Sequence, residues 1–511
     1  MGWLSGSGVG PGAGRAVVAA LALATAALAA GGSALADPAG AAGARPAGPT
    51  PTPLLSVRRV PGWLAATVAT QRVTAAASAP LAALGAAAAT SCLVADQGTR
   101  VLVAAQPTVP LVPASNMKLL TAVAALDRLG PGYRFTTSVV AAAPLAAGVV
   151  TGDLYLVGGG DPVLRTPQYE ATIPDAVPPF TSLPALAAQV AAAGVRQVTG
   201  TVVGDGTRYD ALRTVPGWKP VYAAEGDAGP LSGLDVDDGF HVGIDGYRAD
   251  TDPDQQAAAT FAQLLVADGV QVGPVSPPPP GTPPELAAPA LTAAEAAVAA
   301  LAVAGPAPGA ATPVTTIESA PLAQLLAAVL APSDDTAAEM LTKELGRQTA
   351  GAGTTAAGTA AIAADLAADG LPVEGLVVDD GSGLHTGDRV TCALLAAVLA
   401  RAEATGSPLL GDLAVTGETG TLRHRLTAAG TAGRVRGKTG TLDGVSALSG
   451  VVLPAAGPAT ATALRLRAPV VFSLIMDGVR ADAAVAAGDA VATALAAYPQ
   501  PPDPGALAPV P

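Results

Sequence analysis

The chain has 511 residues, of which 50% are hydrophobic but only 3% aromatic, and its formal net charge is -13 at pH 7. A chain of this length has room for two or more domains. Its acidic balance argues against nucleic acid or an anionic membrane surface as a partner. The hydrophobic excess is mostly alanine, so we expect a core of Ala, Val and Leu.

The N-terminus has the features of a secretory signal peptide, which we assign to residues 1–36. Arg15 supplies a positive charge, residues 16–30 are apolar apart from Thr25, and Ala34-Leu35-Ala36 forms a small-residue cleavage site. The apolar stretch is short for a membrane span, and a retained N-terminal anchor is the alternative. The sequence therefore predicts a secreted, extracytoplasmic protein of the cell wall or periplasmic space, with no stable membrane span after cleavage.

The ordered part of the chain is predicted to follow a low-complexity linker at residues 37–53. Two short apolar runs within residues 93–105 flank a turn and predict a hairpin. A helix should then start near Ser115, where apolar residues begin to recur at helical spacing, and stop at Gly130-Pro131.

Residues 141–312 differ in character and are predicted to form an inserted, β-rich module. Its exit is a segment rich in Pro and Ala at 276–312, with four consecutive prolines at 277–280. Strands are expected at 153–157 and 199–203, and helices at 186–193 and 257–267.

Helical patterns return after residue 321 and are followed by strand patterns. Helices are expected at 322–330, 333–345 and 354–368, from about 391, and at 481–497; strands are expected at 434–453, as a hairpin, and at 468–476. Residues 498–511 are rich in Pro and should form a disordered tail.

Cys92 and Cys392 are the only cysteines. In an exported protein they can form a disulfide, but two free thiols in the core agree equally well with the sequence. Two cysteines and three scattered histidines do not make a zinc site, so neither a metal nor another cofactor is predicted.

Ser115 and Lys118 lie three residues apart and therefore share one helix face. A buried lysine that loses its proton can deprotonate a serine hydroxyl, while the helix N-terminus offers N–H groups to an oxyanion. The alternative is a helix-capping serine followed by a solvated lysine. Only four of the 27 cationic residues are lysine, and this is the chain's one Ser-x-x-Lys. Such usage favours a lysine that must titrate.

Two later stretches, at residues 333–335 and 438–441, form a set of three motifs with Ser115 and Lys118. Ser333-Asp334-Asp335 stands at a predicted helix start, and Lys438-Thr439-Gly440-Thr441 stands on a predicted strand. Each alone can be structural, as a helix cap or a strand end. In the order Ser-x-x-Lys, Ser-Asp-x, Lys-Thr-Gly, the three motifs match those of penicillin-binding proteins and class A β-lactamases.

With these motifs the chain resembles a D-alanyl-D-alanine carboxypeptidase/endopeptidase of the penicillin-binding protein 4 type (low-molecular-mass class C, peptidase family S13). Ser115 and Ser333 are 218 residues apart, more than a compact β-lactamase has room for, and this family carries its extra domains there. Residues 152–162 and 380–384 resemble the start of the family's insert and its loop before the third motif. The resemblance covers about residues 54–497.

The resemblance implies an α/β (α+β) fold with a serine β-lactamase/DD-peptidase-like transpeptidase domain. In that domain an antiparallel sheet is flanked by helices. The domain would consist of residues 54–140 and 313–497, interrupted by the large β-rich module. Peptidoglycan stem peptides would be the substrate, and β-lactams would be covalent inhibitors.

The resemblance also implies the role of each motif residue. Ser115 would attack the carbonyl of a D-Ala-D-Ala bond, Lys118 would act as its base, and Ser333 would relay a proton to the leaving amine. Lys438 would supply positive charge for the substrate carboxylate and the proton network. Backbone N–H groups of Ser115 and Thr441 would form the oxyanion hole. Substrate contacts are expected from Asp335, Thr439, Gly440 and Thr441, with the two threonines at the carboxylate.

Asp335 departs from the family pattern, which has asparagine there. An amide can donate to the substrate carbonyl while accepting from the lysine, but a carboxylate only accepts. A carboxylate also favours the ammonium form of Lys118. Asp335 makes a catalytically weak or inactive wall-binding homologue one alternative, and a β-lactamase or esterase on the same fold is the other.

Overall fold

The computed structural model describes residues 62–85, 90–173, 176–243, 246–273, 302–455 and 468–499. The predicted signal peptide, the linker at 37–53, the proline run at 277–280 and residues 500–511 of the predicted tail lie outside these ranges. None of the helices within them is long and apolar enough to cross a membrane.

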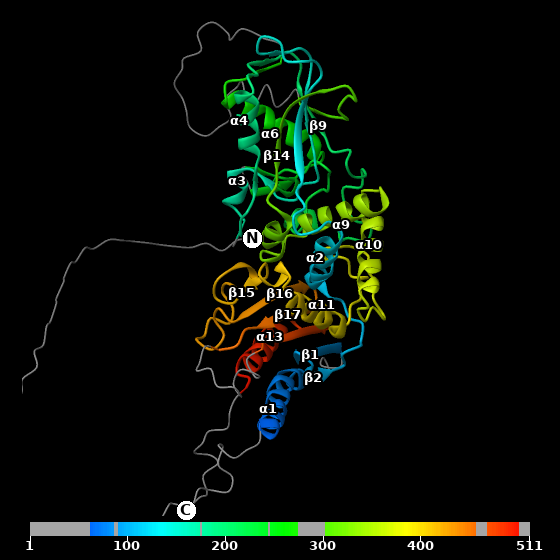
Figure 1. Cartoon of the computed structure of the whole chain (residues 1–511), viewed down its shortest axis with the longest axis vertical. Coiled ribbons are helices and arrows are strands. Elements are labelled where there is room, and N and C mark those ends of the chain that lie inside the picture. The colour runs from blue at the N-terminus through cyan, green and yellow to red at the C-terminus, as the bar shows by residue number, and fades with distance from the viewer. Residues whose placement is uncertain are drawn as a thin grey trace, which may run out of the picture. The chain divides into compact units, whose positions relative to one another are not determined.

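The first region of the fold is built on a six-stranded sheet, in which every pairing is antiparallel (Figure 1). Its strands, in spatial order, are β15 (Ala414–Val415), β16 (Val435–Leu442), β17 (Val445–Val452), β18 (Val470–Asp477), β1 (Ser91–Gln97) and β2 (Arg100–Ala105). The hairpins predicted at 93–105 and 434–453 are confirmed, and β18 is the predicted strand at 468–476.

Side chains along β18 alternate between two apolar cores, as the two-residue period of a strand requires. Val471 and Ile475 pack on the side of α2 and α11, whereas Val470 and Phe472 pack on the side of α1 and α13. Figure 1 shows these two helix layers on opposite faces of the sheet. The helices of this region are α1 (Gly62–Ala83), α2 (Met117–Arg128), α8 (Leu322–Leu330), α9 (Asp335–Ala350), α10 (Thr355–Ala368), α11 (Cys392–Thr405) and α13 (Ala481–Ala496).

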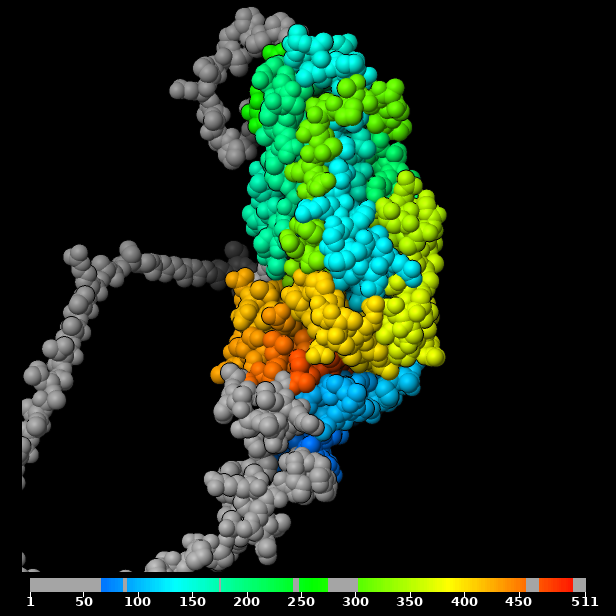
Figure 2. Space-filling view, viewed as in Figure 1, coloured from blue at the N-terminus to red at the C-terminus, as the bar shows by residue number. Residues whose placement is uncertain are grey.

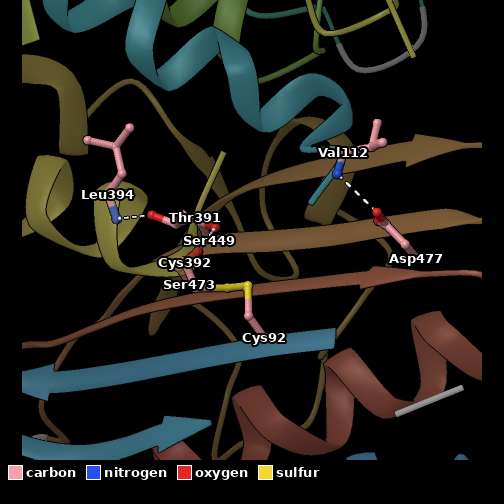
Figure 3. The surroundings of a disulfide bond; sticks show 8 residues. All are labelled: Cys92, Val112, Thr391, Cys392, Leu394, Ser449, Ser473 and Asp477. Atoms are coloured by element: carbon pink, nitrogen blue, oxygen red, sulfur yellow. Dashed lines mark hydrogen bonds between the residues drawn. A yellow bond between two sulfur atoms is a disulfide. The ribbon is translucent and has the colours of Figure 1, made fainter. Parts of the chain in front are cut away.

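A disulfide between Cys92 and Cys392 decides between the two alternatives left by the sequence. Cys92 lies on the face of β1 that is turned toward α11, and Cys392 is the first residue of that helix, capped by Thr391. Figure 3 shows the bond beside Ser449 and Ser473, whose hydroxyls are joined by a hydrogen bond of 2.9 Å. The disulfide therefore ties the central sheet to one of its helix layers.

Residues 136–318, which we call the second region, are organised around a separate five-stranded mixed sheet with its own apolar core. Its strands, in spatial order, are β13 (Val303–Ala304), β9 (Val202–Asp205), β5 (Leu154–Val157), β3 (Thr136–Ala141) and β14 (Thr312–Glu318). The two outermost segments in sequence, β3 and β14, pair with each other. The domain boundaries at 141 and 312 stay a prediction.

Shorter elements complete the second region. The helices are α3 (Pro167–Glu170), α4 (Leu183–Ala192), α5 (Tyr222–Glu225) and α6 (Pro253–Ala267). The short strands are β4 (Val149–Val150), β6 (Leu164–Arg165), β7 (Thr181–Ser182), β8 (Gln197–Val198), β10 (Phe240–Gly243), β11 (Gly246–Ala249) and β12 (Gln271–Val272). On the face shown in Figure 2, the yellow-green surface of α9 and α10 lies directly against the cyan and green surface of this region.

Three predicted boundaries differ from the structure. Of the strand expected at 199–203, only residues 202 and 203 are in a strand, β9, while residues 199–201 link β8 to β9 and include Gly200, where a Cβ would lie 2.2 Å from Asp153 Oδ1. The helix expected from Ser333 begins at Asp335. Tyr498, at the start of the predicted tail, is 7% exposed and packs in the core beside α13.

Candidate active site

The first motif lies on a tight turn that leads into α2. Ala114–Asn116 form a single 3-10 turn, and Ser115 is 9% exposed at its centre. Lys118, one turn later, is only 1% exposed. Its Nζ is 3.2 Å from Ser115 Oγ, 2.5 Å from Asp335 Oδ1 and 2.8 Å from the carbonyl oxygen of Ser382. The ammonium group of Lys118 thus has an acceptor for each of its three N–H bonds.

Two glycines hold this turn by close backbone packing. A Cβ on Gly383 would lie 1.9 Å from the carbonyl oxygen of Ala114, and Gly383 has a φ of +87°, which other residues rarely adopt. A Cβ on Gly440 would lie 2.9 Å from the Pro113 carbonyl oxygen and 2.9 Å from the side-chain Nδ2 of Asn116. Any larger residue at these positions displaces the turn that carries Ser115.

The second motif is the link between α8 and α9. Ser333 has a φ of +73°, Asp334 caps α9 by accepting from the N–H of Ala337, and Asp335 is the first helical residue. Ser333 Oγ is 2.6 Å from Lys438 Nζ. The structure therefore brings the second motif to both of the others, through Asp335 to Lys118 and through Ser333 to Lys438.

The third motif lies on β16. Lys438 is fully buried, and its Nζ also donates to the carbonyl oxygen of Thr439, at 2.9 Å. The Thr439 hydroxyl donates to Thr421 Oγ1 at 2.8 Å, while Thr441 is exposed near the end of the strand. The short strand β15 pairs only with Arg436 and Gly437, so the β16 edge from Lys438 onward is not paired by β15.

Burial and neighbouring charges shift the pKa values of Asp335 and Lys438 at the centre of the site. Burial raises the pKa of Asp335 to about 6, although the positive charges of Lys118 and Lys438 act in the opposite direction. Burial, together with the nearby charge of Lys118, holds the pKa of Lys438 well below its usual range, while Asp335 opposes this shift. Above pH 6, Asp335 is therefore mostly a carboxylate paired with Lys118.

A cavity of about 360 Å³ adjoins the second motif. Its lining includes Ser333, Asp335 and Thr421, together with Tyr169 and Phe240 of the second region. Ser115 does not contribute to this lining. The cavity falls in the size range of small-molecule and peptide subsites.

Ser382 and Glu339 are site residues that the sequence analysis did not identify. The Ser382 carbonyl oxygen accepts from Lys118, and Glu339 Oε1 accepts from the N–H groups of Gly381 and Ser382 at 2.8 and 2.7 Å. Burial, followed by the charge of Asp380, raises the pKa of Glu339 to about 8. The resemblance at 380–384 pointed to this loop, but a glutamate one turn after Asp335 carries no distinguishing signal in the sequence.

Comparison with known proteins identifies the family. The model of the D-Ala-D-Ala carboxypeptidase 3 (S13) family matches residues 71–244 and 288–498. The chain is 34% identical to a D-alanyl-D-alanine carboxypeptidase of Actinomadura sp. (strain R39) over 459 residues, which is 76% of this chain and 77% of that protein. It is 29% identical to a carboxypeptidase of Mycobacterium tuberculosis, with 68% and 69% of the two chains covered.

Among solved structures, penicillin binding protein 4 of Haemophilus influenzae superposes with a TM-score of 0.61 at 17% identity. The match covers 80% of this chain and 95% of that one, and it supports the predicted fold class. The family model and the Actinomadura relative together span most of the chain, including all three motifs. The chain therefore belongs to the D-Ala-D-Ala carboxypeptidase 3 (S13) family and is a serine-type D-Ala-D-Ala carboxypeptidase.

Proposed function

We propose that this protein is an exported penicillin-binding D-Ala-D-Ala carboxypeptidase/endopeptidase that acts on peptidoglycan stem peptides through an acyl intermediate on Ser115. The observation that carries the proposal is the placement of Lys118 Nζ at 3.2 Å from Ser115 Oγ in a buried setting. When Lys118 is neutral, its two N–H bonds satisfy Asp335 and the Ser382 carbonyl. Its lone pair is then left for the serine proton.

The second and third motifs support the later steps. The Ser333 hydroxyl accepts from Lys438 Nζ at 2.6 Å, and the low pKa of Lys438 favours proton exchange between them, so Ser333 can pass a proton to the leaving amine. The part of the β16 edge that β15 does not pair, from Lys438 onward, offers backbone groups to an extended peptide. Thr439, Gly440 and Thr441 line that edge, so we place the terminal carboxylate of the substrate there.

The relatives support the substrate class. The Actinomadura protein is named a D-alanyl-D-alanine carboxypeptidase, and the Haemophilus protein has been solved in complex with a β-lactam. The proposed location outside the cytoplasmic membrane depends on the signal peptide read in residues 1–36. Secreted protein whose N-terminus is Asp37 would support that location.

Fluorescent penicillin tests the proposal. We expect one stable adduct, which peptide mapping by mass places on the peptide that contains Ser115, and complete loss of labelling in Ser115→Ala. An adduct that survives Ser115→Ala contradicts the assignment. Rapid turnover of the drug would indicate a β-lactamase, and absence of any adduct would indicate an inactive wall-binding protein. Products from purified muropeptides then separate carboxypeptidase from endopeptidase activity.

A further inference from the structure

The backbone of the second motif is strained at Ser333, whose hydroxyl contacts Lys438. Ser333 has a φ of +73°, a left-handed conformation that residues with a Cβ adopt only where the surrounding structure enforces it. In this conformation its hydroxyl reaches Lys438 Nζ at 2.6 Å. Some contact must therefore hold the turn, because a relaxed Ser333 would carry its Oγ away from Lys438.

Asp334 provides that contact through both of its carboxylate oxygens. Oδ1 accepts from the N–H of Ala337 at 2.8 Å and caps α9, while Oδ2 forms an ion pair with Arg165. The two contacts restrain the side chain through both of its oxygens. Since Asp334 directly follows Ser333, its position restricts the backbone of the strained residue.

Arg165 belongs to the second region and is itself tightly held. It is 1% exposed, and its Nη2 lies 2.9 and 3.1 Å from the two oxygens of Asp238. Its guanidinium lies 4.8 Å from the ring centre of Phe180 and 5.6 Å from that of Tyr169. The Tyr169 hydroxyl also donates to Asp238, at 2.8 Å. Arg165 is thus a rigid anchor rather than a mobile surface charge.

We propose that Arg165 is a positioning residue for acyl transfer, which acts through Asp334 to keep the Ser333 hydroxyl on Lys438. The inference rests on the proposed function and adds to it a task for the second region. Arg165 does not touch the reacting atoms. Its effect should therefore appear in the chemical step, which needs the proton relay, more than in the initial binding of a β-lactam.

A second ion pair between the same two regions serves as a matched control. Arg208 of the second region contacts Glu344 of α9 through two hydrogen bonds of 2.6 and 2.9 Å, and the Glu344 side chain is fully buried. Glu344 lies nine residues after Asp335, more than two helical turns from the second motif. Removing Arg208 also breaks a buried pair on α9, but far from Ser333.

The test compares Arg165→Met and Arg208→Met with the native protein in stopped-flow acylation by a fluorescent penicillin, which separates the acylation rate constant from the dissociation constant of the first complex. We expect Arg165→Met to lower the acylation rate constant by at least about tenfold, with the dissociation constant within about threefold, because small displacements of a positioned group have large effects on rate. Arg208→Met should change the acylation rate constant by less than about twofold in the folded fraction.

Asp334→Asn provides a second, milder variant. An amide has one acceptor oxygen, so asparagine can keep the α9 cap or the Arg165 contact, but not both. We expect it to slow acylation as well, and the double variant with Arg165→Met to be no slower than the slower single variant. If Arg165→Met does not fold, Asp334→Asn alone carries the test.

Native acylation rates in Arg165→Met or in folded Asp334→Asn would overturn the inference. Equal slowing in Arg165→Met and Arg208→Met would also overturn it, because the effect would then be one of general stability. Failure of the proposed function is a different result, since the native protein itself would then take up no penicillin on Ser115.

Discussion

The first and second motifs lie next to each other but are held in place by different kinds of force. The turn that carries Ser115 is fixed by close backbone packing against Gly383 and Gly440. The turn that carries Ser333 is fixed by charge, through Asp334 and Arg165. Close packing responds to changes in side-chain volume but not to pH, whereas an ion pair responds to pH and to the loss of either charge. The two halves of the site should therefore fail under different substitutions.

The largest effect should come from adding a methyl group on the packing side. Gly383→Ala places a Cβ where only 1.9 Å separates it from the Ala114 carbonyl oxygen, so the Ser115 turn must move. A displacement of about 1 Å costs on the order of a hundredfold in rate, and the φ of +87° adds strain, so we expect penicillin acylation to fall by a hundredfold or more.

Gly370→Ala is the control for backbone strain alone. Gly370 has a φ of +70°, yet a Cβ there would meet no atom within 4 Å. We expect Gly370→Ala to lower thermal stability slightly and to acylate at the native rate. Similar acylation rates in the two variants would show that packing on the Ala114 carbonyl does not position the nucleophile.

Removing the disulfide should reduce stability without affecting either motif. Cys92 and Cys392 close a loop with a sequence separation of 300 residues, between the sheet and α11. We expect Cys92→Ala/Cys392→Ala to lower the free energy of unfolding by about 3 kcal/mol, measured by denaturant titration. Acylation well below the unfolding transition should stay within about twofold of the native rate. Unfolding midpoints that coincide with and without reductant in the native protein would contradict this.

The packing side of the site was largely predictable from the sequence. The hairpins, the helix after Ser115 and the alternating strands follow from hydrophobic periodicity, which records which face is buried. The order of the three motifs then placed Ser115, Lys118, Ser333 and Lys438 in one site. The pairing of Cys92 with Cys392 was left open because it depends on which face of β1 is turned toward α11.

The charged side was much less predictable. Arg165 ends the two-residue strand β6 and Glu339 lies within α9, and neither position differs in sequence pattern from a surface charge. Lysine usage was an imperfect guide as well. Lys343 is 1% exposed, like Lys118, but it is an ion-pair partner of Asp210 outside the three motifs. Buried ion pairs depend on contacts between distant segments, which sequence spacing does not record.

Asp335 lies where the two halves of the site meet, and of these changes its replacement should have the clearest pH dependence. With a pKa of about 6, its carboxyl is mostly ionised above pH 6 and mostly neutral below it. The ionised form lies 2.5 Å from Lys118 Nζ and has no proton to donate to a substrate carbonyl. Asp335→Asn should therefore accelerate acylation at pH 8. The gain could reach about a hundredfold, which is the typical rate loss when one hydrogen-bond donor to the reacting carbonyl is removed.

The gain from Asp335→Asn should shrink as the pH falls through about 6, because the native carboxyl then becomes neutral and can donate as an amide does. The measurement is the ratio of acylation rates of the variant and the native protein from pH 5 to 9. Asp365→Asn is the control, since the pKa of Asp365 is also raised to about 6 by burial, but its partner Arg128 is the last residue of α2, far along the helix from Lys118. The ratio of the acylation rates of Asp365→Asn and the native protein should stay near one at every pH. If Asp335→Asn is slower than the native protein throughout, the carboxylate is an adapted part of the mechanism, and its charge helps rather than hinders the proton transfer from Ser115.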